Sequence, residues 1–135
     1  MAVPKQTSPA ERRRYPRAPA PVLVRCHPIE EAEFQVQSIS RDISVSGIRF
    51  PATEQLRGGS LLELTIELLP DQPPIHAQGE IKWLREFSRI GAPQFEVGVE
   101  FTDMSADDRH RLKIYCARWL KSGAPQRSST TPFAP

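Results

Sequence analysis

The sequence predicts an all-β domain in which about six short antiparallel strands close into a small barrel, followed by one C-terminal α-helix. Three observations support this prediction. Polar and apolar residues alternate with a period of two through most of the chain, turn-forming residues interrupt the alternation roughly every ten to fifteen residues, and the period becomes helical at Ser105. We expect closure because a barrel leaves no exposed strand edge.

Five stretches show the alternation of half-buried strands. Residues 22–26 follow a proline-rich run, and Phe34 and Val36 alternate with glutamines in the next stretch. Residues 60–69 and 75–84 place an apolar side chain at most second positions, and residues 94–101 give the clearest pattern. The connections at 70–74 and 89–93 contain proline and glycine, which favour turns. In the last three stretches the side chains expected on one face are Leu62, Leu64, Ile66, Leu68, Ile75, Ala77, Gly79, Ile81, Trp83, Phe95, Val97, Val99 and Phe101.

Residues 105–122 have the pattern of an amphipathic helix. Ser105 is a good N-cap, and Asp107 and Asp108 lie in the first turn, where the helix dipole favours negative charge. Gly123 follows the expected end. We expect the apolar face to pack on the barrel, and its residues are Leu112, Tyr115, Cys116, Trp119 and Leu120.

The length and composition fit one domain with polar ends. The chain has 135 residues, of which 39% are hydrophobic, enough for one core. Residues 1–10 and 122–135 are rich in proline and small polar residues and are expected to be disordered, which leaves a domain at 11–121. Cys26 and Cys116 are expected as buried free thiols in a reducing cytoplasm. The sequence shows neither a secretory signal nor an apolar run that would insert into a membrane.

Positive charge is concentrated near the N-terminus. Residues 1–25 carry six basic side chains and one acidic one, a net charge of +5, whereas the whole chain carries +2. Four of these arginines lie in the run ERRRYPR at 11–17. A basic arm on a nearly neutral body favours an anionic partner such as nucleic acid, a nucleotide or an acidic surface. For the run taken alone, a solvated basic tail is the competing interpretation.

A second polar stretch, DISVSG at 42–47, contains small hydrogen-bonding residues. Asp42 can only accept hydrogen bonds, Ser44 can donate and accept, and Gly47 permits a close approach or a positive φ. A carboxylate can accept from the N1 and N2 edge of guanine, while an arginine can reach guanine O6 and N7, stack on the base or bind phosphate. The arginines and this stretch together hold the groups for guanine and phosphate recognition. Taken alone, the stretch fits a β-turn capped by its own side chains.

The two stretches in this order, Arg13-x-x-x-Arg17 and then Asp42-x-Ser44-x-x-Gly47, resemble the two-part signature of PilZ domains, which are bacterial receptors for cyclic di-GMP. The stretches GEIKW and GVEF followed by a helix are similar to the second half of that family, so the resemblance covers roughly residues 11–120. It implies a six-stranded antiparallel PilZ-type β-barrel with one C-terminal α-helix. It also implies that Arg13 and Arg17 clamp phosphates and stack on guanines, that Asp42 and Ser44 hydrogen-bond the ligand, and that Gly47 shapes the turn.

Three further residues are candidates through the same resemblance. Arg12 precedes the first motif arginine, and in relatives an arginine there accompanies two mutually intercalated ligand molecules per chain. Arg14 adds charge. Trp83 lies where some relatives use an aromatic side chain beside a guanine, although core packing is the favoured expectation for it.

These features predict a single-domain cytoplasmic receptor that orders its arginine arm on cyclic di-GMP and signals to an unidentified protein partner. A PilZ-like adaptor that binds proteins but no nucleotide is the alternative. A nucleic-acid-binding barrel is a third hypothesis, and the net charge of −3 on residues 26–135 argues against it. No enzyme activity, cofactor or metal is expected, since the histidines are scattered and Glu96 and Glu100 are expected on a solvated strand face.

Overall fold

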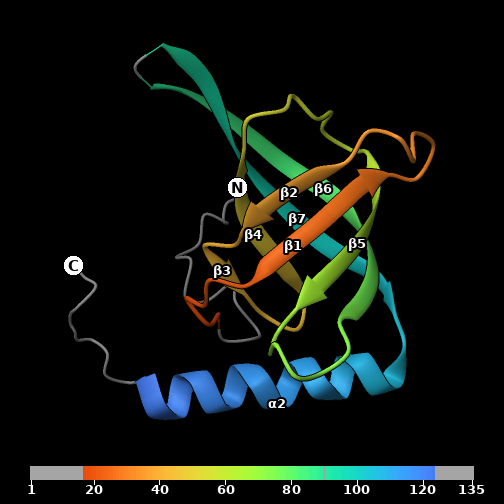
Figure 1. Cartoon of the computed structure of the whole chain (residues 1–135), viewed down its shortest axis with the longest axis vertical. Helices are drawn as coiled ribbons and strands as arrows, with labels where there is room; N and C mark the ends of the chain where they lie inside the picture. Colours follow the sequence, from red (N-terminus) through yellow and green to blue (C-terminus); the bar gives the residue numbers. More distant parts are fainter. Residues whose placement is uncertain (1–16, 90, 124–135) are drawn as a thin grey trace, which may run out of the picture.

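The computed structural model describes residues 17–89 and 91–123, which form one antiparallel sheet and a C-terminal helix, α2 (Ala106–Gly123) (Figure 1). The sheet has seven strands in the order β2-β1-β5-β6-β7-β4-β3. Their bounds are β1 (Leu23–Pro28), β2 (Val36–Ile39), β3 (Asp42–Ile43), β4 (Gly47–Ala52), β5 (Leu61–Glu67), β6 (Ile75–Arg89) and β7 (Ala92–Met104).

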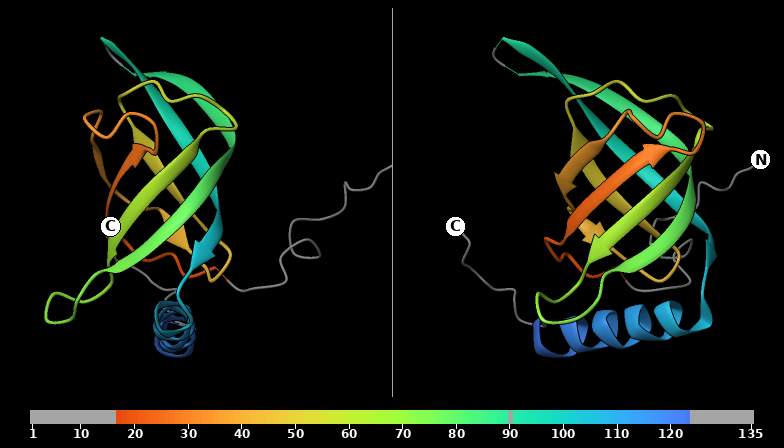
Figure 2. Two further views of the ribbon diagram at one scale, coloured as in Figure 1. Left: turned by 90° about the vertical axis from the view of Figure 1, so that its right-hand side faces the viewer. Right: turned by 45° about the vertical axis from the view of Figure 1, so that its right-hand side comes forward.

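The sheet curls around a common interior, as Figure 2 shows, so the expected β-barrel is confirmed. β2, at one end of the strand order, lies beside β4, the strand next to the other end: the Ser38 hydroxyl on β2 donates to the Pro51 carbonyl on β4. The described residues contain one strand more than expected. The extra strand is the two-residue β3, which pairs with β4 and forms one bridge, Ala18 to Ile43, with the segment before β1.

The core faces follow the alternation of the sequence. The residues expected to be buried on β5 and β7 are buried, and Ile43, Ile48 and Phe50 are fully inaccessible. Helix α2 lies across one end of the barrel, while the tip of the long β6–β7 hairpin projects at the other end (Figures 1 and 2). The core therefore lies inside the curled sheet, against its inner face, and is covered at one end by α2.

Helix α2 docks through the face that the sequence predicts. Leu112 is fully buried and Cys116 nearly so, and the Cys116 thiol donates to the Ile43 carbonyl at 3.6 Å. Ser105 caps the helix, since its Oγ accepts the backbone N–H of Asp108 at 3.1 Å. Tyr115 and Trp119 are partly buried against the core, whereas Leu120, also expected on the buried face, remains 36% exposed.

Both cysteines are free and buried, as expected. Burial raises the pKa of Cys26 to about 12, with a smaller contribution from the negative charge of Glu54. Burial also raises the pKa of Cys116 to about 11. Both thiols therefore stay protonated near neutral pH and serve as small apolar core groups.

Trp83 does not lie in the core, so the favoured expectation for it is wrong. Ile81 pairs with Val99, but Trp83 pairs with the adjacent Gly98, so Lys82 is an extra residue in β6. Such a bulge shifts the alternation by one position. Trp83 consequently points outward and is 43% exposed, with its ring over Gly98, where an added Cβ would lie 2.2 Å from the indole Cε2.

We predict that Leu112→Ala lowers the free energy of unfolding by about 2–5 kcal/mol, because it leaves a cavity between α2 and the barrel. Urea denaturation followed by circular dichroism measures this change. Ile114→Ala is the matched control on the same helix, since Ile114 is 40% exposed, and it should change stability by no more than about 0.5 kcal/mol. Equal effects of the two substitutions would show that α2 does not pack as described.

Candidate functional site

A row of four residues crosses the outer face of the sheet. Asp42 on β3 lies opposite Arg49 on β4, Arg49 opposite Gly98 on β7, and Gly98 opposite Trp83 on β6. Residues directly opposite each other project from the same face of a sheet. Pairing across four strands therefore brings the motif aspartate and the tryptophan onto one surface, with Arg49 between them.

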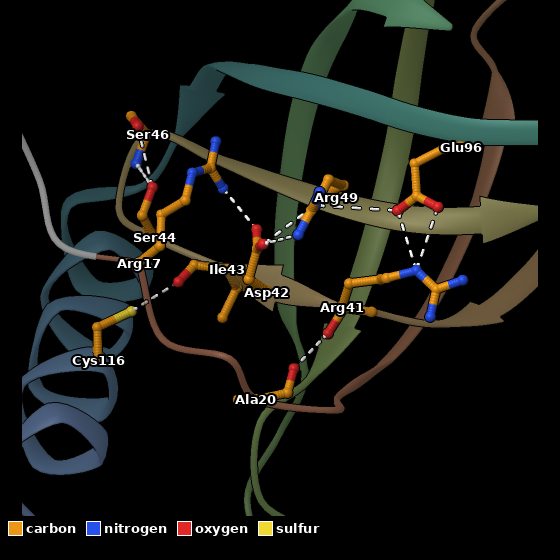
Figure 3. A network of polar contacts seen from close by, with 11 residues as sticks. Arg17, Ala20, Arg41, Asp42, Ile43, Ser44, Ser46, Arg49, Glu96 and Cys116 are labelled. Atoms are coloured by element: carbon orange, nitrogen blue, oxygen red, sulfur yellow. Dashed lines mark hydrogen bonds and ion pairs between the residues drawn. The ribbon is translucent and has the colours of Figure 1, made fainter. Parts of the chain in front are cut away.

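The Asp42 carboxylate is held by two arginines (Figure 3). Arg17 Nη1 donates to Oδ1 at 2.7 Å, while Arg49 donates to Oδ2 through Nε at 3.0 Å and Nη2 at 2.7 Å. The Asp42 side chain is only 12% exposed. A carboxylate this buried is tolerated because both of its oxygens accept charge-assisted hydrogen bonds.

The segment that carries Arg17 is docked against the barrel. Ala18 and Ile43 exchange two backbone hydrogen bonds, at 2.8 and 2.9 Å. Ser40, which is buried, donates through Oγ to the Ala20 carbonyl at 2.6 Å and accepts from the Val22 N–H at 3.0 Å. These bonds fix the backbone immediately after Arg17 beside β3, so the Arg17 side chain reaches Asp42 from a defined position.

Glu96 extends the network away from Asp42. Arg41 Nε donates to both Glu96 oxygens at 3.1 Å, and Arg49 Nε lies 3.9 Å from Oε2. The Glu96 side chain is 4% exposed, so the expectation that Glu96 is solvated is wrong, while Glu100 is exposed as expected. Glu96 is less exposed than Glu100 because two arginines cover it: Arg49 on β4 and Arg41, which immediately precedes β3. A single strand's alternation contains no information about such neighbours.

Ser44 and Gly47 form the turn between β3 and β4. The Ser44 N–H donates to the Gly47 carbonyl at 2.9 Å, and Ser44 Oγ lies 3.0 Å from Ser46 Oγ and accepts the Ser46 N–H at 3.1 Å. Gly47 is required for close approach rather than for a positive φ, since an added Cβ would lie 2.3 Å from the Val99 carbonyl oxygen. Of the two roles considered for Gly47, the geometry selects the first.

The other expected arginines fall outside this description. Arg12, Arg13 and Arg14 lie outside residues 17–89 and 91–123. The structure therefore brings together Arg17, Asp42 and Trp83 on one face, with Ser44 and Gly47 in the adjacent turn.

Sequence reasoning missed three members of the site: Arg41, Arg49 and Glu96. A signal for Arg49 exists, because it interrupts the apolar stretch 48–50 and lies where a tight turn at 44–47 would set it opposite Asp42. The arrangement can present guanidinium groups to phosphate or to a base, and a carboxylate to N–H donors. In the described part of the chain, no group of three or more His, Cys, Asp or Glu side chains could hold a metal ion. No helix there is long and apolar enough to span a bilayer.

Comparisons with known proteins identify similar chains. The family model described as PilZ domain matches residues 11–118. The Bacillus subtilis inhibitor of motility (MotI/DgrA) is similar in structure, with a TM-score of 0.67 and 23% identity, over 89% of this chain and 56% of that one. The PilZ domain of YcgR from Escherichia coli, solved with c-di-GMP, has a TM-score of 0.67 and 14% identity over 88% of this chain and 99% of that one.

The MrkH–c-di-GMP complex of K. pneumonia has a TM-score of 0.67 and 19% identity, over 87% of this chain and 56% of that one. The chain therefore spans little more than half of the length of MotI and MrkH. A comparison with curated protein sequences gave no match. At these identities the structural similarity supports the fold.

We predict that Gly47→Ala lowers the free energy of unfolding by about 1–3 kcal/mol, because the new methyl group would push β4 away from the β7 backbone. Thermal and urea denaturation measure the change. Gly58→Ala is the control, since a Cβ added there would meet nothing within 4 Å and the φ of Gly58 is not positive; it should change stability by no more than about 0.5 kcal/mol. A Gly47→Ala protein as stable as this control would refute the close approach.

Proposed function

The chain belongs to the PilZ domain family, and on this basis we propose that it is a receptor for cyclic di-GMP that changes conformation on binding and signals to a partner protein. One observation carries the proposal. The Asp42 carboxylate lies on the outer face of the barrel between Arg17 and Arg49, in the same cross-strand row as the exposed Trp83. Two of the similar solved structures, of YcgR and MrkH, contain c-di-GMP.

Each candidate residue suits one part of the ligand. A carboxylate accepts from the N1–H and N2–H groups of guanine, which adenine does not present together. Guanidinium groups from Arg17 and from Arg13 bind phosphate or stack on the base. Trp83 offers an exposed ring for stacking beside Arg49. Ser44, at the turn next to Asp42, adds a hydroxyl, and Gly47 keeps the turn against β7.

Exchange of partners at Asp42 would produce the conformational change. In this structure the Arg17 guanidinium donates to the Asp42 carboxylate. A guanine edge at Asp42 would release Arg17 toward the phosphates, and the segment that precedes β1, residues 1–22 with a net charge of +4, would follow it onto the anionic ligand. The ligand would then stabilise one arrangement of this segment, as a two-state switch requires. The reordered segment is the surface that a partner protein would recognise.

We predict that Arg13→Ala and Arg17→Ala each weaken cyclic di-GMP binding by at least about 1.5–3 kcal/mol, the scale of a hydrogen bond to a charged group. Isothermal titration calorimetry of the purified chain measures the affinity and the number of ligands bound. We expect two ligand molecules per chain, because Arg12 and the local positive charge offset the repulsion between their phosphates. Arg25→Ala is the control, since Arg25 lies on β1 and pairs with Glu67. Wild-type affinity in both motif variants would exclude this site.

We predict that Asp42→Asn costs more binding free energy with cyclic di-GMP than with cyclic di-AMP, because adenine lacks the N2 amine that donates a hydrogen bond to the carboxylate. The same calorimetric titration with both nucleotides measures the difference. Melting temperatures identify any loss of stability caused by leaving Arg17 and Arg49 without their carboxylate. Equal losses for the two nucleotides would show that Asp42 only positions its arginines.

A further inference from the structure

A second basic cleft lies beside the Asp42 site. It encloses about 310 Å³ and is lined by Arg41, Arg49, Arg85, Phe87 and Glu96; we call it the Arg85 cleft. Arg85 and Phe87 come from the outer face of β6, beyond the bulge that turns Trp83 outward. Arg49 belongs both to this cleft and to the Asp42 site (Figure 3). The cleft thus adjoins Asp42 and shares Arg41, Arg49 and Glu96 with the network described above, while Arg85 and Phe87 lie outside that network.

The cleft contains guanidinium donors that have no acceptor among the described residues and can bind an external partner. It contains three arginines and one carboxylate. Arg41 uses only Nε on Glu96, and within residues 17–89 and 91–123 its two terminal nitrogens donate to no acceptor. Arg85 is exposed and makes neither an ion pair nor a hydrogen bond with any described residue, although it lies opposite Glu96. Glu96 therefore fixes the position of the Arg41 side chain through Nε alone, and the Nη1 and Nη2 groups of Arg41 remain able to donate to another acceptor.

The neighbouring strand edge favours a polypeptide as the occupant. β5 pairs with β6 only as far as Glu80, so beyond the bulge β6 has β7 as its one strand partner in the described structure. Among the described residues, the edge of β6 along 82–89 that faces away from β7 has no strand partner, and it lies on the far side of β6 from Arg41 and Glu96. An exposed edge of this kind binds extended peptides, so a polypeptide that crosses Arg85 and Phe87 can continue from the cleft onto this edge, whereas a small anion cannot.

We propose that the Arg85 cleft docks an acidic segment of a partner protein, with carboxylates on Arg41 and Arg85 and an apolar side chain against Phe87. Charge complementarity supports this occupant, because Arg49 pairs with Asp42 and Arg41 with Glu96, which leaves the positive charge of Arg85 in excess. Carboxylates also match the fork geometry of free guanidinium groups. The docking itself requires no nucleotide.

Arg49 would couple this cleft to the ligand site, and this part of the inference rests on the proposed function. Arg49 bonds Asp42 directly and lies 3.9 Å from Glu96. A ligand that takes the Asp42 oxygens would leave Glu96 as the nearest carboxylate for Arg49. Arg49 would then compete with Arg41 for Glu96 and free the whole Arg41 guanidinium for the acidic segment. Ligand binding should therefore strengthen docking.

Fluorescence anisotropy with a labelled acidic peptide tests the docking. The probe is a short peptide of aspartate and glutamate with one central leucine, titrated with the full chain at low salt and without nucleotide. Arg85→Glu should weaken binding about tenfold, whereas Arg109→Glu, the same charge change at an exposed position of α2, should weaken it less than about twofold. Melting temperatures confirm that both variants fold, and Arg85→Gln repeats the test without charge reversal.

The outcomes separate this inference from the proposed function. Equal loss in the Arg85 and Arg109 variants, or no binding by wild type, would overturn the docking site even if cyclic di-GMP binds normally. A loss of nucleotide affinity in Arg85→Gln, with displacement of the peptide by cyclic di-GMP, would assign the cleft to the nucleotide and also overturn it. Specific peptide binding in a chain that binds no nucleotide would support the docking site while refuting the proposed function.

Discussion

The outer face of this barrel depends on the ion pairs of one buried carboxylate, that of Asp42. An aspartate with 12% of its side chain exposed must be neutralised, and Arg17 and Arg49 do so from two parts of the chain that are far apart in sequence. Because Arg17 lies immediately before the segment that bridges to β3, the same interaction connects the basic N-terminal region to the barrel. Any group that competes for the Asp42 oxygens therefore acts on the position of that region.

A second buried carboxylate, Glu96 on β7, repeats this arrangement two strands away. It is covered by Arg41 and approached by Arg49, so three arginines and two carboxylates form a continuous chain of ion pairs. Buried ion pairs contribute little net stability, since desolvation offsets most of the attraction. The value of the arrangement lies in orientation, because each carboxylate holds an arginine with donors still facing solvent.

The bulge at Lys82 links the core to this surface. Before the bulge, β6 contributes Ile75 and Ile81 to the interior; after it, the strand turns Trp83 outward over Gly98. Only a glycine beneath the indole leaves room for the ring at this position over β7. The extra residue therefore gives one long strand two roles, with its first half packing the barrel and its second half presenting aromatic and basic side chains near Asp42.

The sequence alone determined the all-β class, the inward faces of β5 and β7, the position and buried face of α2, and the pairing of an arginine motif with an aspartate motif. These features follow from residue periodicity, capping and side-chain chemistry, which are local. The tertiary structure decided that Arg49 lies opposite Asp42, that Glu96 is buried under Arg41, and that Trp83 leaves the core. Alternation along a strand tells only which side of that strand a residue occupies. Its neighbours on that side depend on strand register and bulges, which arise from pairing between residues distant in the chain.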